Sequence, residues 1–197
     1  HHLDLAGAWL RRGTAGLIMT WGLSGSGKSR LAAGLGGALP AVVLRSDVER
    51  KRLLGKGGRD TSLDRGIYSS TASDLTYGRL LDLSRRILRS GFTVIVDASL
   101  LDPARRAPFV DLAARLGVPH LFLRCEAPPE ILRERVVKRA RDGHDPSDAG
   151  PEVLAAQITR YQGLGPGTDS LVVHTDRDTD LSHLAGQVRG RMRDRHP

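Results

Sequence analysis

A glycine-rich segment at residues 22–29 constrains this chain more than any other feature. It reads Gly-Leu-Ser-Gly-Ser-Gly-Lys-Ser and lies between an apolar run at 16–21 and a stretch at 27–38 whose apolar residues recur with helical spacing. Glycines allow successive backbone N–H groups to converge on one anion, and the start of the following helix adds further unpaired N–H groups. The order strand, glycine loop, lysine, hydroxyl and helix therefore predicts a loop that cradles the phosphates of a nucleoside triphosphate.

Two side chains of this loop have specific predicted roles. Lys28 is expected to reach the β- and γ-phosphates, and the Ser29 hydroxyl is expected to bind Mg²⁺. The alternative, an ordinary glycine-rich turn before a chance Lys-Ser pair, does not account for the flanking strand and helix patterns. The other predicted nucleotide contacts in this region are Gly22, Leu23, Ser24, Gly25, Ser26, Gly27 and Arg30.

Apolar segments that alternate with helical stretches predict the fold. Because no hairpin turns separate the strands, the pattern indicates one α/β domain at 16–197 with a parallel sheet and helices on both faces. The expected strands are residues 16–21, 41–45, 92–96, 119–124 and 170–174. The expected helices are residues 27–38, 68–90, 103–116, 129–141, 151–162 and 180–193.

Composition limits the class of protein. The 197 residues suit one domain, and 40% hydrophobic with 26% charged residues is ordinary for a globular protein. No apolar run is long enough to span a membrane, and no signal peptide is visible. Cys125 is the single cysteine, so no internal disulfide can form. We expect this thiol to be buried and the protein to be cytoplasmic.

The charge is strongly basic but does not identify a ligand. A net charge of +8 attracts anions, yet a GC-rich coding sequence gives the same excess of Ala, Gly and Arg. Aromatic residues make up 4% of the chain, which argues against a broad base-stacking surface for single strands. Residues 1–15 open with His-His and lack Met, so we expect a tag remnant or the end of a preceding domain.

Polar residues follow the second and third predicted strands, at the edge where open parallel sheets bind ligands. Asp47 is the candidate general base, which would take the proton of an acceptor hydroxyl during phosphoryl transfer. Arg50 lies one helical turn further on, where its guanidinium can bind an anionic or hydroxylated acceptor. The alternative is that Asp47 caps the following helix, and the two roles are compatible.

Asp97 ends the most hydrophobic predicted strand. A carboxylate at this position is expected to contact Mg²⁺ through water, or to hold the lysine or the loop by hydrogen bonds. Ser99 and Arg105 follow, and either could touch the acceptor or stabilise the next loop.

The arginine-rich segment at about 128–150 predicts a lid. Arg135 and Arg139 lie four residues apart beside Lys138, and this crowding of like charge is unfavourable unless an anion neutralises it. A closing lid that delivers Arg135 and Arg139 to the nucleotide phosphates, with Arg139 acting on the transferred group, would explain the pattern. The alternative is a solvated basic face.

These motifs together resemble those of phosphate-loop kinases, over about residues 16–175. The chain is similar to the branch that contains polynucleotide 5′-hydroxyl kinases, zeta-toxin-like kinases and chloramphenicol phosphotransferases. It looks most like bacterial kinase domains that sometimes follow an aminoglycoside-phosphotransferase-like domain. The sequences that carry the resemblance are the loop at 22–29, Arg-Ser-Asp-Val-Glu-Arg at 45–50 and Val-Ile-Val-Asp-Ala-Ser-Leu-Leu-Asp-Pro-Ala-Arg-Arg at 94–106. The runs at 46–53 and 145–149 look especially similar to the bacterial kinase domains.

The resemblance implies a fold and a set of roles. The fold is a three-layer αβα sandwich of the P-loop NTPase type, with five parallel strands in the order 2-3-1-4-5 and a helical lid. Asp47 matches the base and Arg50 the acceptor-binding arginine, while Arg139 falls among the lid arginines. Lys28 and Ser29 match the residues that bind ATP and Mg²⁺.

The expected activity is transfer of the γ-phosphoryl group of ATP to a hydroxyl of a small molecule or a nucleic-acid 5′ end. Residues 55–66 match no specificity pattern, so the acceptor stays open. The alternative is an NTPase switch or a regulatory ATP-binding module that hydrolyses ATP without a phosphorylated acceptor. Against a switch, no Asn-Lys-x-Asp sequence occurs, and Ala98 stands where motor ATPases place a glutamate.

Overall fold

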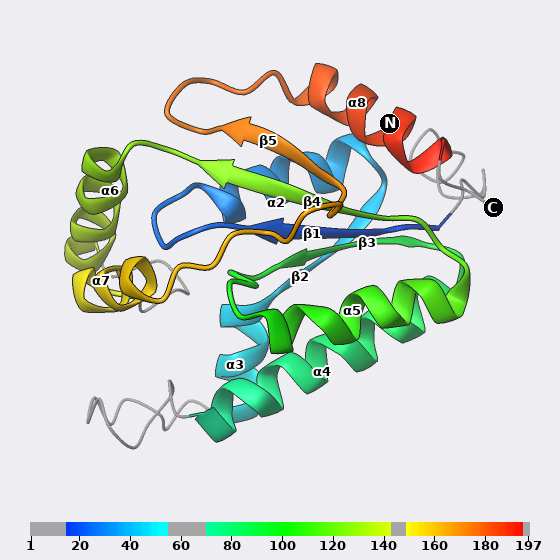
Figure 1. The fold of residues 1–197 in the computed structure, drawn as a ribbon, viewed down its shortest axis with the longest axis horizontal. Coiled ribbons are helices and arrows are strands. Elements are labelled where there is room, and N and C mark those ends of the chain that lie inside the picture. Colours follow the sequence, from blue (N-terminus) through cyan, green and yellow to red (C-terminus); the bar gives the residue numbers. More distant parts are fainter. Residues whose placement is uncertain (1–14, 55–69, 143–148, 195–197) are drawn as a thin grey trace.

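The computed structural model describes residues 15–54, 70–142 and 149–194. Five strands form one all-parallel sheet in the order β2-β3-β1-β4-β5, with helices on both faces (Figure 1). The predicted three-layer fold and strand order are therefore confirmed. The strands are β1 (Leu17–Trp21), β2 (Ala41–Arg45), β3 (Thr93–Asp97), β4 (His120–Glu126) and β5 (Ser170–His174). The helices are α2 (Lys28–Ala38), α3 (Ser46–Leu54), α4 (Ser70–Arg89), α5 (Pro103–Leu116), α6 (Pro129–Asp142), α7 (Pro151–Thr159) and α8 (Leu181–Arg193).

Element boundaries differ from the prediction by a few residues. The helix expected at 151–162 ends at Thr159, and the chain then turns so that Tyr161 packs edge-on against Trp21 with ring centroids 5.2 Å apart. Helix α3 follows β2 without a connecting loop. The sequence indicated α3 only as the helix that Asp47 could cap.

Strand β1 is the centre of the sheet and the most buried strand. All five of its residues are buried, because β3 and β4 pair with it on either side and helices cover both faces. Its side chains alternate between the two faces, as the pleat of a strand requires. Leu17, Met19 and Trp21 belong to one hydrophobic cluster, and Ile18 belongs to the other.

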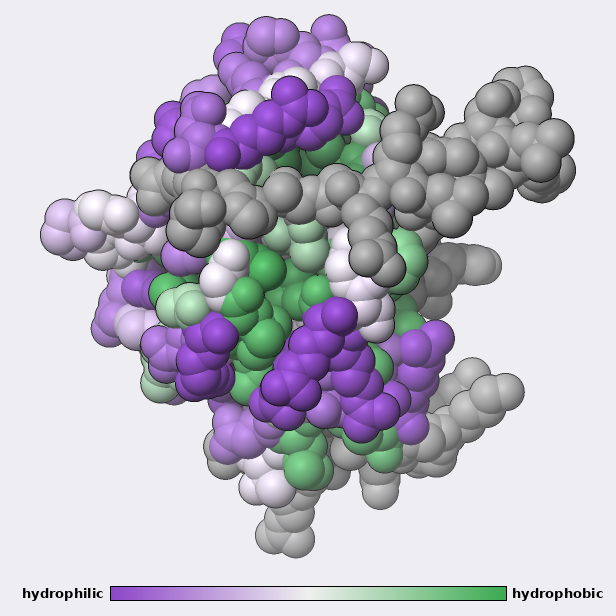
Figure 2. Space-filling view, turned by 90° about the vertical axis from the view of Figure 1, so that its right-hand side faces the viewer, coloured by the Kyte–Doolittle hydropathy of each residue, from purple (hydrophilic) through white to green (hydrophobic). Residues whose placement is uncertain are grey.

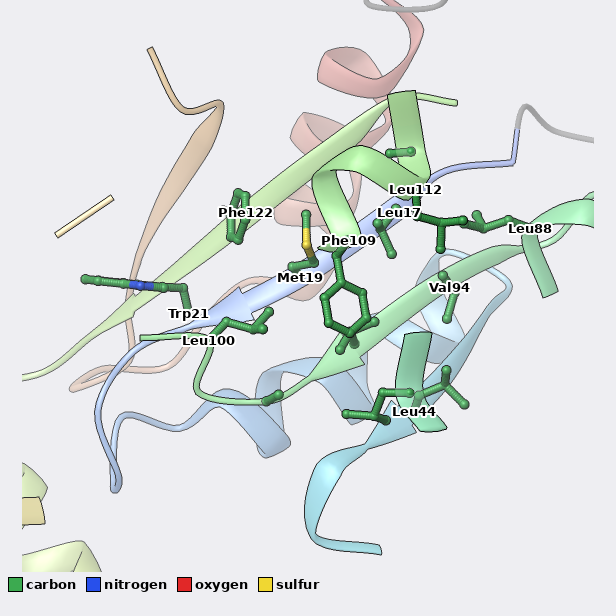
Figure 3. Packing of buried hydrophobic residues seen from close by; sticks show 14 residues of the cluster. Leu17, Met19, Trp21, Leu44, Leu88, Val94, Leu100, Phe109, Leu112 and Phe122 are labelled. Atoms are coloured by element: carbon green, nitrogen blue, oxygen red, sulfur yellow. The ribbon is translucent and has the colours of Figure 1, made fainter. Parts of the chain in front are cut away.

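Each face of the sheet has its own hydrophobic core. On the first face, Leu80 and Leu88 of α4 and Phe109 of α5 pack with the odd-numbered residues of β1, and Figure 3 shows Phe109 extending from α5 towards the strands. On the other face, helices α2 and α8 cover the sheet, with Leu35 and Val188 among the buried residues. Near-continuous apolar strands are expected where a parallel sheet is covered on both sides.

The two ends of the sheet differ in character. Figure 2 faces the end where the strands begin, and hydrophobic residues are visible there between hydrophilic ones. At the opposite end, where the strands finish, α6 and α7 lie beside the loop that follows β1 (Figure 1).

Among the described helices, none is long and apolar enough to cross a membrane.

Cys125 of β4 is buried in the core beside α2 and α8, as the sequence predicts. Burial raises the pKa of its thiol from 9.0 to about 12. We therefore expect no labelling of the native protein by a thiol reagent at pH 8 and stoichiometric labelling in guanidinium chloride. Rapid labelling of the native chain would contradict this burial.

The same shift predicts a pH dependence. Because the folded pKa lies above the unfolded one, this contribution to stability is complete below about pH 9 and declines as the pH rises towards 12. A Cys125→Ala variant, which cannot ionise here, should show a shallower loss of unfolding free energy over that range.

Candidate active site

The loop between β1 and α2 has the backbone geometry that its glycines predict. Gly25 and Gly27 have φ angles of 82° and 77°, a region that L side chains rarely adopt. A Cβ atom on Gly25 would also lie 2.6 Å from the carbonyl oxygen of Leu132 in α6. The loop can therefore lie this close to α6 only with glycine at position 25.

Lys28 is the first residue of α2, and its side chain folds back over the loop. Its Nζ donates hydrogen bonds to the carbonyl oxygens of Gly22 at 2.9 Å and Leu23 at 2.7 Å. Burial lowers the pKa of this ammonium group, while Cys125, Asp97 and Asp47 act in the opposite direction. Asp47 and Asp97 are therefore close enough to act electrostatically on the predicted phosphate-binding lysine.

Asp97 is the last residue of β3 and is 4% exposed. Burial raises the pKa of its carboxyl group, and a hydrogen bond with Ser29 and the charges of Lys28 and Arg45 oppose that rise. Arg45, its register partner on β2, places Nε 3.3 Å from Asp97 Oδ2. The hydroxyl and carboxylate predicted to serve Mg²⁺ thus lie side by side.

Asp47 and Arg50 form an ion pair one helical turn apart, as predicted. Arg50 Nη1 donates to Asp47 Oδ1 at 3.0 Å. Because α3 begins at Ser46, Asp47 lies in the first turn rather than before it, where a negative charge favours the helix dipole.

A cleft of about 800 Å³ joins the phosphate loop to the ends of β2 and β3. This volume is within the usual range for a ligand pocket. Gly22, Leu23 and Ser26 are not among the residues that line the cleft. The predicted site residues that line the cleft are Ser24, Gly25, Gly27, Lys28, Ser29, Arg30, Asp47, Arg50, Asp97, Arg135 and Arg139.

Helix α6 places Arg135 and Arg139 in the cleft, but carbonyl oxygens already bind both guanidinium groups. Arg135 donates to Gly25 O at 3.3 Å and to Thr175 O at 2.6 Å. Arg139 donates to Ala149 O at 2.6 Å. The basic face of α6 is therefore not simply solvated. The carbonyl oxygens offset part of the predicted repulsion between its positive side chains.

Comparison with known protein families shows which family this chain belongs to. The sequence model of the AAA domain family matches residues 17–164. The chain belongs to this AAA domain family. This agrees with the resemblance to phosphate-loop kinases and with the strand order of the sheet.

Relatives of this AAA domain include an uncharacterized protein of Mycobacterium tuberculosis, 35% identical over 169 residues. The match covers 84% of this chain but only 33% of that protein, so the chain spans a third of the length of this relative. An adenylyl-sulfate kinase of Myxococcus xanthus is 28% identical over 178 residues, covering 84% of this chain and 85% of the kinase.

Solved structures share the fold of this AAA domain. A protein of Chloroflexus aurantiacus provisionally assigned as a kinase superposes with a TM-score of 0.73 at 23% identity, covering 91% of this chain and 99% of that one. An APS kinase of Mycobacterium tuberculosis in complex with AMPPNP and APS gives a TM-score of 0.64 at 21% identity, covering 91% and 98%.

Two residues of this AAA domain contact the phosphate loop without having been predicted. Thr175 Oγ1 donates to the carbonyl oxygen of Ser26 at 3.0 Å, and Gln157 Oε1 of α7 accepts from the backbone N–H of Ser24 at 2.7 Å. Thr175 directly follows β5, so the rule applied to the first three strand ends could have found it. Gln157 gives no comparable signal, because it is one polar residue on an amphipathic helix.

A small hydrophobic cluster holds α6 and α7 against the loop. It contains Leu132 and Val136 of α6 and Leu154 of α7, and Leu23 and Ala127 pack on it. The phosphate loop is therefore fixed by apolar contact as well as by hydrogen bonds.

Several predictions concern residues outside the described part of the chain. These are the acceptor segment at 55–66, the last part of the lid at 143–148 and the N-terminal extension up to residue 14.

Replacing Thr175 by Val tests the bridge between β5 and the loop. Valine keeps the shape but removes the hydroxyl, so Ser26 O and Arg135 each lose a partner. We expect a loss of about 1–3 kcal/mol in unfolding free energy by urea denaturation. Thr159→Val is the matched control, because that exposed hydroxyl bonds only to a carbonyl of its own helix, Ala155 O. Equal effects of the two substitutions would contradict the role of Thr175.

Proposed function

We propose that this AAA domain is an ATP-dependent kinase that phosphorylates a hydroxyl group of an acceptor. The observation that carries the proposal is the shared cleft, in which Asp47 lies close enough to the phosphate loop to act on the pKa of Lys28. A carboxylate near the transferred phosphate is needed to accept the proton of a hydroxyl.

The nucleotide would bind with its phosphates against the loop and the first turn of α2. Lys28 Nζ now bonds to two loop carbonyls, so it can turn to the β- and γ-phosphates without leaving the cleft. The AMPPNP complex of the structurally similar APS kinase supports a triphosphate at this loop.

Mg²⁺ suits the donor set at the end of β3. This ion prefers oxygen ligands and takes only one or two from the protein, with water and phosphate supplying the rest. The Ser29 hydroxyl and the buried Asp97 carboxylate fit that need. When bound, Mg²⁺ would neutralise charge on the β- and γ-phosphates.

Asp47 would act as the general base of the transfer. The acceptor oxygen forms a bond to the γ-phosphorus as the bond between that phosphorus and the β,γ-bridging oxygen breaks, and ADP leaves. The hydroxyl proton passes to the Asp47 carboxylate. Arg50, at 3.0 Å from Asp47, holds this carboxylate in place and faces the acceptor.

The two lid arginines, Arg135 and Arg139, would have different roles. Arg135 ties α6 to the loop through Gly25 O and Thr175. Arg139 bonds to one carbonyl of the chain segment before α7, lines the cleft and lowers the pKa of Lys28 by its charge. We therefore assign stabilisation of the transferred phosphoryl group to Arg139, while Arg135 keeps the nucleotide site in shape.

Replacing Lys28 by Ala should weaken binding of Mg–AMPPNP by about 100-fold or more in calorimetric titration, because a buried cation at the phosphates is lost. Arg133→Ala is the control: it removes an exposed cation of α6 that lies outside the cleft lining. Unchanged affinity of a folded Lys28→Ala protein would remove this loop as the nucleotide site.

Asp47→Asn should leave the affinity for ATP within about threefold and slow transfer by about 10²–10⁴-fold, because the base is lost while the Arg50 contact can remain. The assay follows γ-labelled ATP with aminoglycosides, other antibiotics, nucleosides, adenylyl sulfate and 5′-hydroxyl oligonucleotides. Label found only as free phosphate with every acceptor would favour an ATP-hydrolysing switch or regulatory module over a kinase.

A further inference from the structure

The cleft has two halves on either side of β1. Since β3 and β2 lie on one side of β1, the residues that follow these strands form one half, which we call the acceptor half. It is lined by residues of α3, the start of α4 and the connection from β3 to α5. The loop, α6, α7 and the segment after β5 line the other half, where the nucleotide would lie.

Arg105 adds a second guanidinium group to the acceptor half. The charge of Arg50 is balanced there by Asp47 at 3.0 Å. Arg105 lines the cleft, whereas its carboxylate partners, Asp74 at 3.4 Å and Asp102 at 3.8 Å, are not part of the described lining. Both carboxylates are more than half exposed, so water screens their charge.

The position of Arg105 is well defined by its neighbours. Its guanidinium lies 5.2 Å from the centroid of the Tyr77 ring, in a cation–π contact with another residue of the lining. Arg105 is also in the first turn of α5, where Asp102 caps the helix by accepting from Ala104 N. A guanidinium group that lines the cleft, while its carboxylate partners lie outside the described lining, is suited to bind an anion.

The rest of the acceptor half is polar. Ser46, Ser73 and Ser99 line it with Tyr77, and among the described residues no large aliphatic side chain does. Such a surface suits a hydrophilic molecule rather than a lipophilic one.

We infer, on the basis of the proposed kinase function, that the acceptor carries a carboxylate, phosphate or sulfate group besides its reacting hydroxyl, and that Arg105 binds this anionic group. Asp47 then faces the hydroxyl while Arg105 fixes the far end of the molecule. Recognition at two points holds the hydroxyl in line for attack on the γ-phosphorus.

The test uses matched acceptor pairs and the full chain saturated with Mg–AMPPNP, so that the phosphate loop is filled. Each pair keeps the same skeleton and differs at the position of the anion: glucose against glucuronate for a carboxylate, and a nucleoside against its 3′-phosphate or 3′-sulfate for the two esters. We expect the anionic member of at least one pair to bind about tenfold or more tightly than the neutral one in calorimetric titration.

Variants identify the residue responsible. Arg105→Gln should remove the preference for the anionic member and leave the affinity for AMPPNP unchanged. Arg105→Lys should keep part of the preference for the anionic member. Arg115→Gln, which removes an exposed arginine from the last turn of the same helix, should behave as wild type.

Each outcome separates the inference from the proposed function. Equal binding of both members of every pair, no binding of any, or an unaltered preference in Arg105→Gln would overturn the role of Arg105. Selective binding of an anionic acceptor without phosphate transfer from ATP would leave the anion site in place and overturn the kinase proposal.

Discussion

The position of β1 between β3 and β4 determines where the candidate active site of this domain lies. Every residue of β1 is buried, so the strand cannot shift without exposing both cores. The loop that follows it must then emerge at the middle of the sheet edge. Asp97 lies on one side of that point and the segment after β5 on the other, which is why residues distant in sequence line one cleft.

Electrostatics at this edge are organised before any ligand binds. Among the described residues, Lys28, Arg135 and Arg139 each donate to backbone carbonyl oxygens. Carbonyl dipoles can be exchanged for phosphate oxygens at lower cost than a full ion pair, because no opposite charge is left unpaired. In the proposed function, these side chains would turn from carbonyl to phosphate oxygens within the same cleft, and charges already placed at a site are a major source of rate enhancement in enzymes.

The sequence predicted the strands and most helices well, and the residues it singled out at the glycine loop and at the ends of β2 and β3 line one cleft, because both depend on local patterns. Apolar runs and helical spacing indicated each strand and most helices, and the glycine loop indicated Lys28 and Ser29. Contacts that form only when the chain folds could not be predicted from the sequence. Gln157 reaches Ser24 through the packing of α6 on α7, and the early end of α7 at Thr159 accompanies the contact of Tyr161 with Trp21. No local pattern encodes either contact.

Helices α6 and α7 share a hydrophobic cluster that is separate from the two cores of the sheet. Within the described residues, the partly buried hydrophobic residues packed against this cluster are Leu23 and Ala127. Releasing these helices would therefore expose far less apolar surface than global unfolding does. Amide protons of α6 and α7 should exchange with solvent through a partial opening that costs less free energy than global unfolding. Amide protons of β1 should exchange only when the whole domain unfolds. The pair would then form a cooperative unit of its own, able to detach while the sheet stays intact.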